Sequence, residues 1–83
     1  MKILVRNLAR TSTEDAVRAL FAEYGHVESC VVVKDAETQQ SKGFGFVEMP
    51  NPVHAINAIK RLNTRRFEGS VLRVKRVEET TEK

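Results

Sequence analysis

Residues 42–49, Lys-Gly-Phe-Gly-Phe-Val-Glu-Met, alternate glycine with aromatic residues in a pattern typical of a β-strand with one specialised face. Phe44 and Phe46 are two residues apart, so on a strand both side chains project from the same side of a sheet. Gly43 and Gly45 weaken such a strand but leave no side chain to crowd its backbone. Exposed aromatic rings are costly unless something stacks on them, and nucleic-acid bases are the commonest flat partner. The run therefore predicts an aromatic surface on which RNA bases stack.

The charge of the chain is unevenly distributed. The formal net charge is +3, from 14 Lys and Arg and 11 Asp and Glu. Residues 78–83 hold three glutamates and one lysine, so residues 1–77 carry a net charge of +5. A basic body with a short acidic tail fits a protein that binds a polyanion, and an excess this modest also fits an ordinary soluble protein.

Length and cysteine content narrow the class of protein. Eighty-three residues predict one domain, and a hydrophobic content of 41% is ordinary for a folded chain. The single cysteine, Cys30, excludes an internal disulfide and lies in an apolar run, which predicts a buried side chain in a reducing compartment. The apolar run at residues 3–5 is too short for a signal-peptide core of roughly 7–15 residues or a membrane span of about 20. We therefore expect a cytoplasmic protein without membrane contact, or a nuclear one if its source has a nucleus.

The first third of the chain predicts a strand followed by a helix. A β-rich run occupies residues 2–8, and Ser12 or Thr13 is placed to cap the helix. Gly25 is placed to end that helix as a C-terminal cap. One apolar stripe at helical spacing is formed by Val17, Leu20, Phe21 and Tyr24.

The rest of the chain predicts two strands, a second helix and a last strand. Residues 27–34 form the second strand, and the polar loop 35–41 leads into the aromatic strand. Asn51, between two prolines, is placed to cap the second helix. Its apolar stripe is formed by Ala55, Ala58, Ile59 and Leu62. Residues 65–70 turn the chain into a last strand at 71–77, with Leu72 and Val74 facing inward.

The predicted fold class is α+β with the element order β-α-β-β-α-β, the ferredoxin-like arrangement. Two helices then cover one face of a four-stranded antiparallel sheet and leave the other face open. We expect residues 1–77 to form this single RNA-binding domain and residues 78–83 to be a short acidic, flexible tail.

With these elements in place, the sequence resembles the RNA recognition motif (RRM) family over almost its whole length. The eight-residue motif of that family runs basic, Gly, aromatic, Gly or Ala, aromatic, aliphatic, any residue, aromatic. Residues 42–48 match it at every specified position, and only Met49 departs, at a position that points into the core in the family. The family's six-residue motif corresponds to residues 3–8, Ile-Leu-Val-Arg-Asn-Leu, where Leu4 replaces an aromatic residue and Arg6 a common glycine.

The resemblance implies a set of RNA-contacting residues, most of them on the open face. Phe44 and Phe46 would stack bases, and Leu4 would offer apolar surface without full π-stacking. Phosphates or base edges would be contacted by Lys2, Arg6, Asn7, Lys42, Arg73, Lys75 and Arg76. Main-chain groups around residues 76–78 would read base edges, and Glu48 is the one acid expected on this face.

The resemblance suggests a stand-alone, bacterial-type RRM. We expect it to bind single-stranded RNA as a post-transcriptional RNA-binding protein, with single-stranded DNA as a weaker ligand. The alternative is a protein-interaction module that docks a peptide or a second copy of the chain on the same apolar centre. We expect no enzyme, cofactor or small-molecule substrate, because no phosphate-cradling glycine loop is present. We also expect no metal site, because His26, Cys30 and His54 lack zinc-site spacing. His54 is expected to face solvent.

Overall fold

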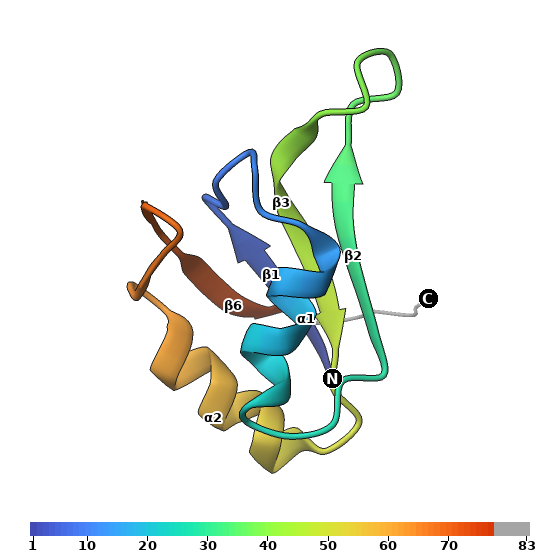
Figure 1. Ribbon diagram of the computed structural model, residues 1–83. Coiled ribbons are helices and arrows are strands. Elements are labelled where there is room, and N and C mark those ends of the chain that lie inside the picture. Colours follow the sequence, from blue (N-terminus) through green and yellow to red (C-terminus); the bar gives the residue numbers. More distant parts are fainter. Residues whose placement is uncertain (78–83) are drawn as a thin grey trace.

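Four strands form one antiparallel sheet in the order β2-β3-β1-β6, and two helices pack against one of its faces (Figure 1). The computed structural model describes residues 1–77, and the predicted acidic tail at 78–83 lies outside the described residues. The main elements are β1 (Lys2–Arg6), α1 (Glu14–Ala22), β2 (Ser29–Lys34), β3 (Ser41–Glu48), α2 (Pro52–Leu62) and β6 (Arg73–Val77). A short additional hairpin pairs β4 (Arg66–Phe67) with β5 (Ser70–Val71). The predicted ferredoxin-like fold is confirmed.

The register of the central strand β1 sets which side chains share a face. Leu4 lies opposite Phe46 of β3 and Lys75 of β6, and Arg6 lies opposite Phe44 and Arg73. Because successive side chains alternate between the two faces, these residues are on one side of the sheet. Ile3 and Val5 point to the other side and are completely buried beneath the helices.

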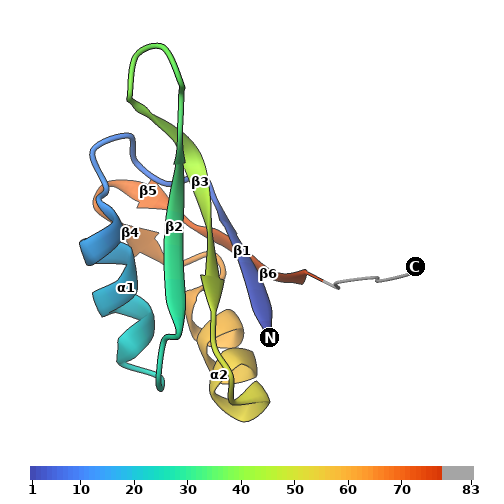
Figure 2. The same cartoon turned by 90° about the vertical axis from the view of Figure 1, so that its right-hand side faces the viewer.

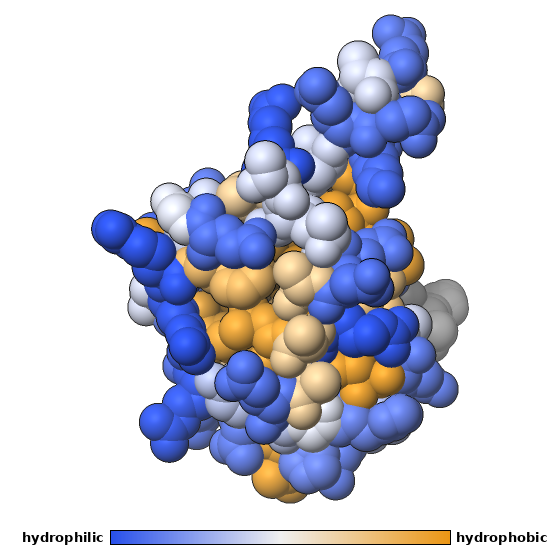
Figure 3. All heavy atoms as spheres, in the orientation of Figure 1, coloured by the Kyte–Doolittle hydropathy of each residue, from blue (hydrophilic) through white to orange (hydrophobic). Residues whose placement is uncertain are grey.

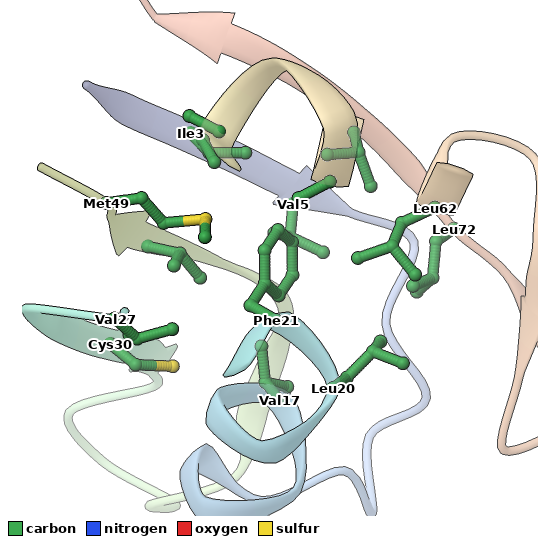
Figure 4. Close-up of a cluster of buried hydrophobic side chains, with 14 of the residues drawn as sticks. Ile3, Val5, Val17, Leu20, Phe21, Val27, Cys30, Met49, Leu62 and Leu72 are labelled. Carbon is green, nitrogen blue, oxygen red and sulfur yellow. The ribbon is translucent and has the colours of Figure 1, made fainter. Parts of the chain in front are cut away.

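The core lies between the sheet and the helices, with Phe21 of α1 near its centre (Figure 4). Met49 is fully buried, as predicted, so it is a packing residue and contributes no aromatic ring to the open face. Leu72 and Val74 face inward as predicted. Cys30 is also buried, and this burial raises the pKa of its thiol above the ordinary value.

Both helices begin at capping residues that the sequence indicated. Thr13 accepts a hydrogen bond from the Ala16 N–H at 3.1 Å, which selects Thr13 over Ser12 as the cap of α1. The Asn51 side chain accepts from the N–H groups of Val53 and His54 at 2.9 and 3.3 Å. These bonds satisfy backbone donors that have no partner within the first turn of a helix.

Replacing Asn51 with alanine is expected to lower the free energy of unfolding by about 1 kcal/mol, because two backbone donors lose their acceptor. Urea denaturation followed by circular dichroism measures this change. Asn51→Asp is the matched control, since a carboxylate accepts the same bonds and should retain the stability. An alanine variant as stable as the original chain would show that this cap does not contribute.

Three local details differ from the prediction. Helix α1 ends at Ala22, so Tyr24 lies beyond it and packs against the edge of the core. The last strand of the main sheet begins at Arg73, because the preceding residues form the β4–β5 hairpin. His54 was expected to face solvent, but it packs closely over Gly25, where a Cβ atom would overlap its ring. Its Nδ1 atom is buried without a hydrogen-bond partner among the described residues.

Candidate nucleic-acid interface

Among the described residues, no helix covers the side of the sheet opposite α1 and α2 (Figure 2). We call this side the open face. Its side chains come from alternate positions of all four strands: Lys2, Leu4, Arg6, Val31, Phe44, Phe46, Glu48, Arg73 and Lys75. The register therefore brings together seven of the predicted RNA-contacting residues from three strands, and the eighth, Lys42, lies at the start of β3 beside Phe44.

Apolar side chains form a row across the middle of the open face. Leu4 on β1 and Val31 on β2 lie opposite Phe46 from its two sides, and Val31 is 51% exposed. The rings of Phe44 and Phe46 have centroids 6.2 Å apart and are perpendicular, at 89°. Because the two rings are not coplanar, one base cannot lie flat on both, and each ring presents its own stacking plane.

Lys2 lies over one of these stacking surfaces. Its Nζ atom is 4.7 Å from the centroid of the Phe46 ring, within the range of a cation–π interaction. Such a contact is worth about 0.5–1 kcal/mol at an exposed site, whereas stacking a base is worth about 1–3 kcal/mol. A base can therefore displace the ammonium from the ring, which leaves Lys2 free to meet a phosphate.

Three cations gather where β1 and β6 lie side by side. Arg6 and Arg73 are directly opposite each other in the register, and like charges in this position destabilise a sheet. Together with Lys75 they line a hollow of about 360 Å³ that also contacts Asn63. None of the three forms an ion pair within the described part of the chain. An anion bound here would relieve their mutual repulsion.

Asn7 has a structural partner that was not predicted. It follows β1 with a φ of 62°, and its Nδ2 atom donates to the carbonyl oxygen of Val71 at 2.6 Å. The next residue, Leu8, donates its N–H to the carbonyl oxygen of Gly43 at 2.8 Å. Asn7 therefore ties the exit of β1 to β5, and its role in RNA contact stays a prediction.

Arg76 does not share the open face with the other predicted cations. The register places it opposite Ile3 and on the same side of β6 as Val74, whose side chain is in the core. Its side chain therefore starts from the helix side of the sheet, because strand positions alternate. The predicted main-chain contacts reach residue 78, which lies outside the described residues.

Arg10 was not among the predicted RNA-contacting residues, yet its side chain is exposed beside Phe44 and Lys42. It lies in the loop between β1 and α1, where no periodic pattern assigns a face to it. Only the folding of that loop against β3 brings it to the aromatic strand.

Residues 1–77 contain neither a metal-binding cluster nor a membrane-spanning helix. No group of three or more His, Cys, Asp or Glu side chains is arranged to hold a metal ion. No helix in this range is long and apolar enough to cross a membrane.

Comparison with known proteins identifies the family of this chain. The sequence model described as RNA recognition motif matches residues 3–73. Polyadenylate-binding protein 2 of Arabidopsis thaliana is 40% identical over 81 residues, which are 98% of this chain and 13% of that protein. This chain therefore corresponds to a small part of that relative.

Two solved structures extend the comparison. The crystal structure of RNA binding protein PG1 is 41% identical, with a TM-score of 0.92 over 99% of both chains. A Sex-lethal protein–RNA complex is 27% identical, with a TM-score of 0.89 over 98% of this chain and 48% of that one.

Proposed function

We propose that this chain, which belongs to the RNA recognition motif family, binds single-stranded RNA across the open face of its sheet. The observation that carries the proposal is the half-buried pair Phe44 and Phe46 on the open face, with Leu4 beside them and the cations Arg6, Arg73 and Lys75 on the adjoining strands. Flat aromatic surface next to positive charge suits a ligand that alternates bases with phosphates.

We infer different tasks for different parts of the open face. Phe44 and Phe46 each stack one base, in different planes, and Leu4 adds apolar contact beneath. Arg6, Arg73 and Lys75 hold phosphates or base edges at the β1–β6 side. Lys2, displaced from Phe46, and Lys42 hold phosphates along the aromatic strand. In this arrangement stacking supplies affinity for unpaired bases, and the cations supply attraction to any RNA.

The relatives support this proposal. One similar structure is a protein–RNA complex, and one similar protein is named for binding polyadenylate. For this chain we propose a binding domain in residues 1–77 that acts on RNA after transcription, in the cytoplasm, without catalysing a reaction. Single-stranded DNA is expected to bind more weakly, because it lacks the 2′-hydroxyl groups that distinguish RNA.

RNA binding is expected to weaken steeply as salt rises. Each phosphate contacted on a single strand contributes about 0.7 to the slope of log affinity against log salt concentration. Five cations on phosphates would therefore give a slope of roughly −3.5. Titration of labelled single-stranded RNA and DNA pools at several salt concentrations, with amide NMR shifts, measures both the slope and the surface used. Shifts that avoid the open face at saturating RNA would overturn the proposal.

The alternative function is docking of a protein, or of a second copy of this chain, on the same face. The exposure of Val31 beside Phe46 favours it, because an apolar centre suits a protein interface as well as a base. Such a contact should respond little to salt, and a self-associating chain should sediment as a dimer at high concentration. Monomeric behaviour would exclude self-association, and salt-sensitive RNA binding on the open face would favour RNA over a protein partner there.

A further inference from the structure

We propose that Arg10, with Lys42, forms a phosphate-binding subsite beside Phe44, at the end of the sheet where the β1–α1 and β2–β3 loops meet. The proposal rests on the RNA-binding function above and adds to it Arg10, which lies outside the family's two strand motifs. The ligand is the phosphodiester group next to the base stacked on Phe44. The RNA would then continue beyond the sheet at this end.

The β1–α1 and β2–β3 loops border two hollows next to the aromatic strand β3. Both lie at the same end of the sheet, and the polar β2–β3 loop projects beyond it (Figures 1 and 3). Two hollows, of about 290 and 470 Å³, open here, and Arg10, Lys42 and Phe44 line both of them. A ligand in this space therefore touches two cations and an aromatic ring at once.

The backbone that carries Arg10 is fixed at both ends. On one side the Leu8 N–H donates to the Gly43 carbonyl oxygen, which joins this loop to β3. On the other side Ser12 is buried, its N–H donates to the carbonyl oxygen of Ala9, and its hydroxyl donates to Glu68 at 2.5 Å. The Arg10 side chain itself is exposed. A guanidinium on a fixed backbone loses less entropy on binding an anion than one on a loose loop.

The charge of the two hollows favours an anion. Arg6 also lines the smaller hollow, and the larger one contains a single acid, Asp35. The Asp35 carboxylate accepts hydrogen bonds from the N–H groups of Glu37 and Thr38, which together with the nearby Lys42 hold its pKa below the ordinary value. Across the two hollows three cations therefore outnumber one carboxylate, of which one oxygen accepts both loop hydrogen bonds. Because Phe44 forms the wall, the anion that fits best is attached to a flat ring, as a nucleotide phosphate is.

Replacing Arg10 with glutamine tests the subsite. We expect RNA affinity to fall about three- to tenfold, equally for different RNA sequences, and the salt slope to lose about 0.7. The matched control is Arg61→Gln, because Arg61 is exposed on α2 and faces away from the open face. Arg61→Gln should leave both the RNA affinity and the salt slope almost unchanged. Thermal denaturation of both variants checks that the fold is intact.

A second variant changes affinity in the opposite direction. Asp35→Asn removes the one negative charge but keeps an oxygen that can accept the two loop hydrogen bonds. We expect RNA to bind two- to fivefold more tightly. Unchanged or weaker binding by this variant would contradict a phosphate in the hollow.

The outcomes separate this subsite from the proposed function. If Arg10→Gln binds RNA with the original affinity and slope while Phe44→Ala does not, the subsite is refuted and the RNA-binding function stands. If affinity falls but the slope does not, Arg10 acts through structure and the subsite is also refuted. If the original chain binds no RNA, the proposed function fails with it.

Discussion

Replacing Phe44 or Phe46 with alanine is expected to weaken RNA binding by about 1–3 kcal/mol each, or roughly 5- to 150-fold. Each ring gives a base an aromatic stacking surface, which the neighbouring Leu4 cannot replace because it has no π-system. The two losses should not add fully, because the rings are in edge-to-face contact and one affects the orientation of the other. Fluorescence anisotropy with labelled RNA measures each affinity.

The fold should survive both substitutions. The rings lie on the open face, whereas the core is on the other side of the sheet and contains neither of them. Phe44→Tyr and Phe46→Tyr are matched controls that keep an aromatic ring and should retain most of the affinity. Val53→Ala removes an exposed apolar side chain from α2 and should have no effect on RNA. Normal binding by either alanine variant, at normal stability, would refute stacking as the source of affinity.

Replacing Gly45 with alanine is expected to cost about 3 kcal/mol of folding free energy, the upper part of the usual range for overpacking. The added Cβ would overlap the carbonyl oxygen of Val31 and lie 3.0 Å from the Cα atom of Val32. Both atoms belong to the backbone of β2, so relief requires the strand itself to move. Urea denaturation measures the loss, and reduced RNA affinity should follow because β2 and β3 both build the open face.

Gly69→Ala is the control that separates crowding from backbone strain. At Gly69 no atom lies within 4 Å of an added Cβ, but φ is +87°, which favours glycine. This variant should cost about 1 kcal/mol, from backbone strain alone. At Gly45 the cost is steric and should be clearly larger. If Gly45→Ala left the free energy of unfolding unchanged or raised it, β2 could not lie as close to Gly45 as described.

The open face could be predicted from sequence because its pattern is local. Two phenylalanines at a spacing of two define the aromatic surface, and the same alternation places Met49 and Val74 in the core. Applied to the last strand, that alternation also assigns Arg76 to the side of Val74, and its contact with RNA stays a prediction. Caps such as Asn51 were equally local, because a cap bonds to residues two and three positions away.

The details that only tertiary structure decided depend on contacts between distant parts of the chain. Lys2 lies over Phe46 because β1 pairs with β3, and Arg10 reaches Phe44 because Leu8 bonds to Gly43. Likewise Asn7 was predicted to contact RNA because of its place in a motif. In the folded chain its side-chain amide donates a hydrogen bond to the carbonyl oxygen of Val71, 64 residues away. The periodicity of a strand predicts which face of the sheet a side chain lies on. It does not predict which distant residue contacts that side chain. The sequence by itself thus determined the fold and the aromatic surface, and the packing of loops against strands decided how charge is arranged around it.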